Sequence, residues 1–174
     1  MTVRVILSVV GSDRPGLTNA LADAVHAAGG NWLESHLSRL GGKYVGSVLV
    51  EVDAAALPAL EAQAREVDAS GLRVSLVRAD EAAPRSGEAL TIELVGQDRA
   101  GIVREVTAVL AGLDVNIDSL TTATENGAWS GERLFRAQAR VTLPEGLTSD
   151  AVQSALEAIS GDVMVDFTVT PAGA

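Results

Sequence analysis

Val10-Gly11-Ser12-Asp13-Arg14-Pro15-Gly16-Leu17 is followed later in the chain by a close copy of itself, Val95-Gly96-Gln97-Asp98-Arg99-Ala100-Gly101-Ile102. The aspartates of the two stretches are 85 positions apart (98 − 13 = 85), and Asn31 and Asn116 keep the same separation (116 − 31 = 85). A register kept over this length indicates a duplicated unit, because a chance motif would not carry its neighbours with it. The sequence therefore predicts two units of one fold.

The hydrophobic periodicity of the first unit predicts the order strand, helix, strand, strand, helix, strand. Alternation of period two over residues 3–9 is typical of a strand, and helical spacing of apolar residues begins at Leu17. Asp13 is expected to cap that helix, Pro15 to lie in its first turn and Gly29-Gly30 to end it. The remaining elements are expected as strands at 31–40 and 44–52, a hairpin turn at 41–43, a helix from about residue 53 and a strand at 72–76.

The second unit repeats this order after a linker. Residues 79–88 have turn-forming and charged composition, so the predicted domains are 1–78 and 89–174. The second hairpin, 125–132, is longer than the first, and the last strand is expected to contain Val163, Val165 and Phe167. With right-handed crossovers, each βαββαβ unit forms a four-stranded antiparallel sheet with two helices on one face. The predicted fold class is therefore α+β, with two ferredoxin-like domains.

The composition restricts the function classes. The 174-residue chain has a net charge of −10, which would repel a phosphate backbone and disfavours direct nucleic-acid binding. It contains no cysteine, which excludes disulfides, zinc-thiolate sites and thiol nucleophiles. No apolar run has the length of a membrane span, and the expected location is the cytoplasm. No cofactor is expected.

The fold also serves RNA binding and catalysis in other proteins, but the residues of this chain give little support to either use. RNA binding needs several stacking aromatics in a basic setting, whereas Tyr44 stands alone and is expected to be an exposed residue of an ordinary strand. Catalysis needs a nucleophile or an acid–base group beside an orienting partner, but His26 and His36 have no counterpart in the second unit and are expected on the surface. No carboxylate cluster has the spacing of a calcium loop. The chain is not expected to be an enzyme.

The duplicated turn offers a binding site for a small zwitterion. Gly16 and Gly101 leave backbone N–H groups accessible where a helix begins, and the helix dipole favours an anion there. Asn31 and Asn116 begin the strand that follows that helix, and an amide side chain supplies both a donor and an acceptor. Each residue also has a purely structural interpretation, as turn glycine or as the asparagine that ends a helix. The combination, present twice, favours binding.

The stretches Asp13-Arg14-Pro15-Gly16-Leu17 with Asn31, and Asp98-Arg99-Ala100-Gly101-Ile102 with Asn116, resemble the signature of ACT domains, the ligand-sensing modules of amino-acid metabolism. A chain of two such domains resembles the glycine cleavage system transcriptional repressor family. Similar turns occur in ACT domains attached to formyltetrahydrofolate deformylase, phosphoserine phosphatase and uridylyltransferases. The resemblance implies that an amino acid binds between the first loop of one domain and the strand-start asparagine of its neighbour. The candidate ligand-binding residues that it implies are Asp13, Arg14, Pro15, Gly16, Leu17, Asn31, Asp98, Arg99, Ala100, Gly101, Ile102 and Asn116. Ala100 replaces the proline of the pattern and is expected to loosen the second turn.

The resulting hypothesis is an amino-acid-sensing regulator that forms a homodimer and acts through a protein partner. Glycine and serine are the ligands that the resemblance implies. One alternative is a ligand-free interaction or dimerisation module of amino-acid or one-carbon metabolism, which would use an exposed strand edge or sheet face. Another is a small hydrolase or transferase that uses the Asp-Arg turns.

Overall fold

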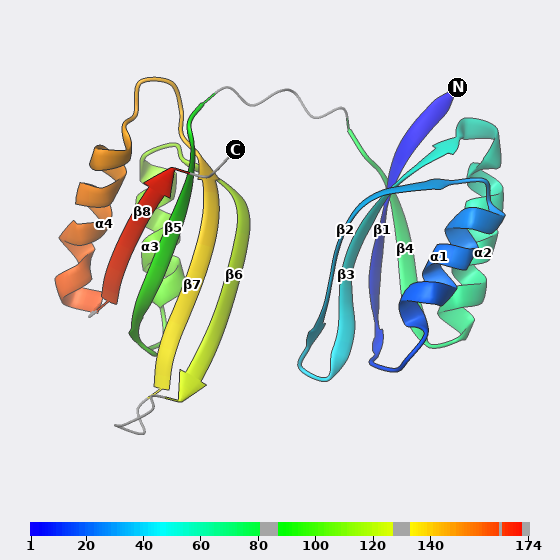
Figure 1. Ribbon diagram of the computed structural model, residues 1–174, viewed down its shortest axis with the longest axis horizontal. Helices are drawn as coiled ribbons and strands as arrows, with labels where there is room; N and C mark the ends of the chain where they lie inside the picture. Colours follow the sequence, from blue (N-terminus) through cyan, green and yellow to red (C-terminus); the bar gives the residue numbers. More distant parts are fainter. Residues whose placement is uncertain (81–86, 127–132, 164, 172–174) are drawn as a thin grey trace. The chain divides into compact units, whose positions relative to one another are not determined.

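The computed structural model describes residues 1–80, 87–126, 133–163 and 165–171 of the chain, which divides into two compact units, Met1–Ala82 and Ala83–Ala174. Each unit has the order strand, helix, strand, strand, helix, strand, and Figure 1 shows both helices of each unit on one face of its sheet. This arrangement confirms the predicted α+β class with two ferredoxin-like domains. Among the described residues, no helix is both long and apolar enough to cross a membrane.

The first unit is a four-stranded sheet in the order β2-β3-β1-β4, so β2 and β4 are its edges. All of its pairings are antiparallel. Its elements are β1 (Thr2–Ser12), α1 (Leu17–Ala27), β2 (Asn31–Leu40), β3 (Lys43–Asp53), the short 3-10 turn η1 (Ala54–Ala56), α2 (Leu57–Ala69) and β4 (Leu72–Arg78).

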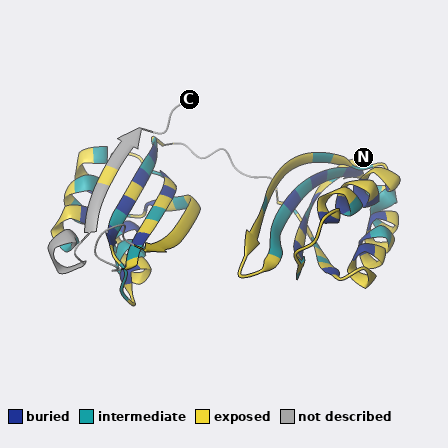
Figure 2. Cartoon of the chain, turned by 60° about the horizontal axis from the view of Figure 1, so that its bottom comes forward, coloured by how far each residue is buried: buried dark blue, intermediate teal, exposed yellow. Residues whose placement is uncertain are grey.

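Alternation along the two central strands places one row of side chains under the helices. Val5 is paired with Val50 and Leu7 with Val48, and all four are at most 2% exposed. Figure 2 shows this alternation of buried and exposed residues along the strands. The core is completed by helix residues such as Leu21, which is fully buried. The period of two in the sequence therefore marks a sheet that is covered on one face.

The second unit repeats the sheet in the order β6-β7-β5-β8. Its elements are β5 (Ala89–Gln97), α3 (Ile102–Gly112), β6 (Asn116–Asn126), β7 (Arg133–Thr142), α4 (Ser149–Val163) and β8 (Val165–Pro171). Leu90, Ile92 and Val141 lie in its core with Leu110 and Leu156 from the two helices. Most of the predicted linker (79–88) and most of the predicted hairpin (125–132) lie outside the described residues.

Three local predictions were wrong. Tyr44 is half-buried on the helix-covered face, because its hydroxyl lies 2.6 Å from Thr18 Oγ1 and its ring packs against the core. Val163 ends α4 and does not belong to the last strand. The second helix of the first unit begins at Leu57 and not near Asp53, since η1 intervenes. His26 and His36 are exposed, as predicted.

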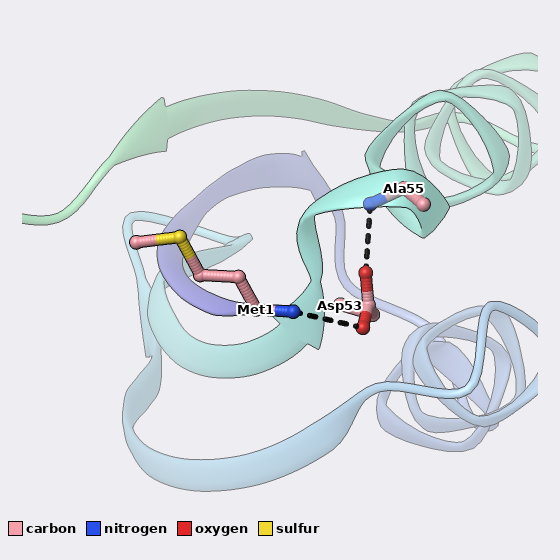
Figure 3. Close-up of polar contacts among 3 residues, drawn as sticks. All are labelled: Met1, Asp53 and Ala55. Atoms are coloured by element: carbon pink, nitrogen blue, oxygen red, sulfur yellow. Dashed lines mark hydrogen bonds and ion pairs between the residues drawn. The ribbon is translucent and has the colours of Figure 1, made fainter.

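Asp53 is the residue that starts η1. Its Oδ1 accepts a hydrogen bond of 2.9 Å from the backbone N–H of Ala55, and its Oδ2 lies 3.4 Å from the amino group of Met1 (Figure 3). The Ala55 hydrogen bond, followed by the hydrogen bond and charge of the amino terminus, lowers the pKa of Asp53 below its ordinary value of 3.8. The ionised carboxylate is therefore favoured in the folded state.

This shift predicts a pH-dependent contribution of Asp53 to the stability of the first unit. A carboxylate whose pKa is lowered by folding stabilises above its unfolded pKa, and this stabilisation is lost as the pH falls through the folded pKa. We expect Asp53→Asn to be less stable than the wild type near neutral pH, with the difference shrinking as the pH falls below 3.8. Urea unfolding of both proteins across this range measures it. A difference that is constant with pH would contradict the assignment.

Candidate functional site

The loops that carry the duplicated motif connect the first strand and first helix of each unit. We call residues 13–16 the first loop and residues 98–101 the second loop. Gly16 (φ 91°) and Gly101 (φ 94°) are the residues immediately before α1 and α3, and neither helix start is capped by a side chain. An L-residue rarely adopts this left-handed backbone, which explains the glycine at both positions. Both helix starts can therefore present backbone N–H groups to an anion.

The predicted capping role of Asp13 was wrong. Its carboxylate lies 3.2 Å from Arg39 Nε at the end of β2, and that of Asp98 lies 3.6 Å from Arg133 Nε at the start of β7. Because the glycine, three residues later, starts the helix, the aspartate is one turn too early to cap it. Pro15 likewise lies in the turn before α1 and not in its first turn. The aspartates tie each loop to the neighbouring hairpin.

Leu17 and Ile102 anchor the two loops to the cores. Each side chain is 3% exposed and packs in a hydrophobic cluster of its unit. Their side chains are therefore unavailable to a ligand, and only their backbone could contribute to binding. Pro15 and Ala100 are exposed at the corresponding positions of the two turns.

The surroundings of the first loop are open. Nothing lies within 4 Å of the position that a Cβ on Gly16 would take, and Arg14 turns away to donate a hydrogen bond of 2.5 Å to the carbonyl of Ser70. Beside this loop, at the end of β1, is a cleft of about 480 Å³ that Lys43 and Arg73 border. The residues lining it are Val10, Gly11, Ser12, Lys43, Asp68, Gly71 and Arg73. Lys43 is paired with Ser12 and Arg73 with Val10, so both side chains project from the sheet face opposite the helices, and Asp68 adds a carboxylate to the same cleft.

The second loop has different surroundings. Arg99 forms two hydrogen bonds with the carboxylate of Glu105 on α3, one of them 3.1 Å long. Glu105 Oε1 lies 3.7 Å from the position that a Cβ on Gly101 would take. A carboxylate of the protein therefore lies beside the start of α3, where the first loop has open space.

The two asparagines also differ. Asn116 Nδ2 donates a hydrogen bond of 2.7 Å to Asp118, and the same carboxylate accepts one of 2.6 Å from Thr142. Within the described ranges, the exposed side chain of Asn31 forms no hydrogen bond. Its amide is therefore available to a ligand, whereas that of Asn116 is engaged.

Within one unit, the loop and the asparagine lie at opposite ends of the sheet. Asn31 is paired with Glu51 and through it with Arg4, whereas the first loop begins after Ser12. The eight residue-to-residue steps from Arg4 to Ser12 (12 − 4 = 8) span about 26 Å of extended strand. Asn116 is separated from the second loop in the same way, because it is paired through Thr142 with Ala89. A single unit therefore does not bring the two predicted halves of the site together.

Sequence reasoning missed Lys43, Arg73 and Glu105 as residues of the loop environment. Lys43 and Arg73 could not be found, because they are brought to the end of β1 only by the strand register. Glu105 left a weak signal, since an acidic residue in the first turn of a helix can reach a loop arginine. No group of residues suited to holding a metal ion is found in the part of the chain that the structure describes.

Comparison with known proteins agrees with this architecture. Residues 4–75 match the ACT domain family. The structure is similar over its length to an unknown protein from Galdieria sulphuraria, with a TM-score of 0.83, 30% sequence identity, and 99% of this chain and 100% of that chain covered. It also has the fold of a protein provisionally assigned as a glycine cleavage system transcriptional repressor, with a TM-score of 0.73, 18% identity, and 100% and 99% covered. No curated protein matches the sequence.

The first unit matches the family in sequence, and the second repeats its strand order, its left-handed glycine and its loop motif. The first unit belongs to the ACT domain family, and the chain carries two ACT-like units in tandem.

Proposed function

We propose that this protein is an amino-acid-sensing regulator that binds a small amino acid between the first loop of one chain and Asn31 of a second chain. The proposal rests on one observation: the first loop and Asn31 lie near opposite ends of the exposed edge strand β2. Because neither end of one unit holds both elements, a complete site requires a second unit. Glycine and serine are the proposed ligands, and a protein partner is proposed to receive the signal.

The carboxylate of the ligand would bind at the first loop. The N–H groups at the start of α1 are uncapped by side chains, and Gly16 leaves the space in front of them open. Lys43 and Arg73 add positive charge at the same end of the unit. Hydrogen bonds from backbone N–H groups to a carboxylate are charge-assisted and stronger than neutral ones. These two cations would offset part of the negative charge of the chain, −10 in total, at this end of the unit.

The ammonium of the ligand would bind at Asn31. The side-chain carbonyl oxygen of asparagine accepts hydrogen bonds, and its NH2 group can still donate one to the ligand carboxylate. Asn31 is exposed at the start of β2 and has no competing hydrogen bond within the described ranges. The amide therefore suits a zwitterion that is already held by its carboxylate.

The edge strand β2 suggests how two chains would complete the site. It has ten residues, no strand beside it on its outer edge among the described residues, and apolar side chains at Leu33 and Leu40 that are 40% and 69% exposed. An unpaired edge of this length is a template for pairing with another strand. Antiparallel pairing of two β2 strands about a two-fold axis would bring Asn31 of one chain level with Arg39 of the other. Arg39 is bound to Asp13 of the first loop, so the two halves would meet.

Regulation would follow if the ligand favours one arrangement of the chains. A ligand shifts such an equilibrium only by its differential affinity for the two arrangements, and a ligand held by two chains has that property. The acidic charge disfavours DNA as the receiver of the signal. We therefore propose that a protein partner recognises the ligand-bound dimer. The fold shared with the assigned glycine cleavage repressor supports a regulatory role over a catalytic one.

Titration with amino acids tests the proposal directly. We expect glycine or serine to give a saturable heat of binding in calorimetry, and large side chains such as tryptophan to give none. Binding should shift sedimentation toward the dimer, because the ligand contacts both chains. Flat titrations with all twenty common amino acids would contradict the sensing function.

The alternative is a dimerisation module without ligand, and the exposed edge of β2 favours it equally. The two proposals differ at Gly16, which precedes α1 and is not a residue of β2. If the chain only dimerises, glycine and serine change the dimerisation of neither the wild type nor Gly16→Ala. If it is a sensor, Gly16→Ala loses the response of the dimer to glycine or serine while retaining dimerisation at high protein concentration.

A further inference from the structure

We propose that the second unit has closed its own copy of the site with two carboxylates, Glu105 and Asp118, so that only the first loop and Asn31 respond to ligand. This inference rests on the proposed function. The two units have the same fold, and positions 85 residues apart correspond to each other. Differences between corresponding residues therefore explain differences between the two loops and between the two asparagines.

Glu105 lies beside the start of α3, where a ligand carboxylate would bind at the second loop. Both partners of the Arg99–Glu105 pair are 36% exposed, and Glu105 Oε1 lies close to Gly101 at the start of α3. The position 85 residues earlier is Ala20, which has no charge to place there. Arg14, the counterpart of Arg99, is bound to the carbonyl of Ser70 instead. The start of α1 is therefore open, and the start of α3 already has an anion of the protein beside it.

Asp118 has the corresponding effect at the other end of the second unit. It accepts hydrogen bonds from Asn116 and from Thr142, which fixes the amide against its own strand. The position 85 residues earlier is Leu33, which cannot hold Asn31 in this way. In the second unit Nδ2 of Asn116 is thus already bonded and a carboxylate lies beside the helix start, whereas the described residues of the first unit form neither contact.

A tethered carboxylate is a strong competitor for a free one. Groups held on the same short segment have effective concentrations on the order of millimolar or higher, and a free amino acid must exceed this to displace them. Displacing Glu105 would also leave the guanidinium of Arg99 without its ion pair. In this arrangement Arg99 and Glu105 stabilise the second loop.

The experiment compares the two loops in the full-length protein with three probes: glycine, serine and acetate. Calorimetry with glycine and serine counts the sites per chain. NMR follows the amide signals of Gly16 and Gly101 during titration with acetate, which carries only the carboxylate. We expect one site per chain in the wild type and an acetate response at Gly16 at least tenfold greater in affinity than at Gly101.

Exchanging the residues between the units should exchange the behaviour. Glu105→Ala should make the Gly101 signal respond to acetate, and Glu105→Ala with Asp118→Leu should add a second amino-acid site per chain. Ala20→Glu should weaken binding at the first loop at least tenfold. Glu145→Ala removes one negative charge from an exposed position of the second unit and should change nothing. Glu105→Gln keeps the size of the side chain and should give the same acetate response as Glu105→Ala if α3 remains folded.

The outcomes separate this inference from the proposed function. Two sites per chain in the wild type, or equal acetate responses at Gly16 and Gly101, would overturn the closure of the second unit while leaving amino-acid sensing intact. An unchanged Gly101 response in both Glu105 variants would also overturn it. Flat glycine and serine titrations of the wild type would instead contradict the proposed function, and the acetate comparison would still decide whether Glu105 closes the second loop.

Discussion

Replacing Gly46 with alanine is expected to destabilise the first unit by about 2–5 kcal/mol, a large part of the stability of a small domain. Gly46 lies in β3 with φ 147°, a backbone conformation that L-residues rarely adopt. A Cβ at this position would lie 1.9 Å from the carbonyl oxygen of His36 on the neighbouring strand β2. Backbone strain costs about 1–2 kcal/mol and forcing the strands apart adds about 1–3 kcal/mol.

Gly42→Ala is the matched control for this variant. Gly42 lies in the hairpin between β2 and β3 with φ 77°, and a Cβ there would meet nothing within 4 Å. It therefore carries the backbone strain alone and should cost about 1–2 kcal/mol. The difference in free energy of unfolding between the two variants measures how closely β2 approaches β3.

The fluorescence of Trp32, which packs against the core of the first unit, reports the unfolding. A Trp129→Phe background makes Trp32 the sole tryptophan of the chain, so that urea unfolding reports on the first unit. Equal losses of stability for Gly46→Ala and Gly42→Ala would contradict the close strand approach. The loss of stability in Gly46→Ala should also release β2 from the sheet and so remove the edge that is proposed for dimerisation.

The strand and helix order could be predicted from the sequence because it depends on apolar periodicity. The predicted strand 31–40 coincides with β2, and the helix that Gly29 and Gly30 end is α1. The predictions were wrong where a single backbone angle or side-chain contact determines the local structure. Asp13 has the right residue type for a cap, but the left-handed Gly16 starts the helix later. Tyr44 belongs to the buried face because Thr18 supplies a partner for its hydroxyl.

The candidate site could be predicted only as a list of residues. The repeated motif identified both loops and both asparagines, but the sequence did not indicate that the two elements lie at opposite ends of each unit. That separation follows from the strand register, because β2 runs antiparallel to β3 along its length. The difference between the two units was also hidden, since it depends on Glu105 reaching the second loop and on Asp118 reaching Asn116. Side chains outside the motif therefore distinguish two units that the motif makes equal.

The largest expected effect on function is the recovery of binding when two inactive variants are combined. Gly16→Ala should weaken amino-acid binding at least tenfold, because it strains the left-handed turn and covers the N–H groups at the start of α1. Asn31→Ala should do the same by removing the amide half of the site. Gly146→Ala, at φ 85° in an open turn of the second unit, is the control for backbone strain and should leave binding unchanged.

In a two-fold dimer, each site takes its loop from one chain and its asparagine from the other. A mixed dimer of the Gly16→Ala and Asn31→Ala chains therefore has one site that carries both changes and one site that carries neither. We expect such a dimer, prepared by co-expression with two affinity tags, to bind one amino acid with the affinity of the wild type, although either variant alone binds weakly. If each chain carried a complete site by itself, the mixed dimer would show no recovery, and calorimetry distinguishes the two results. Recovery to one site per dimer would place the ligand between two chains, because no arrangement within a single chain leaves an intact loop and an intact asparagine together.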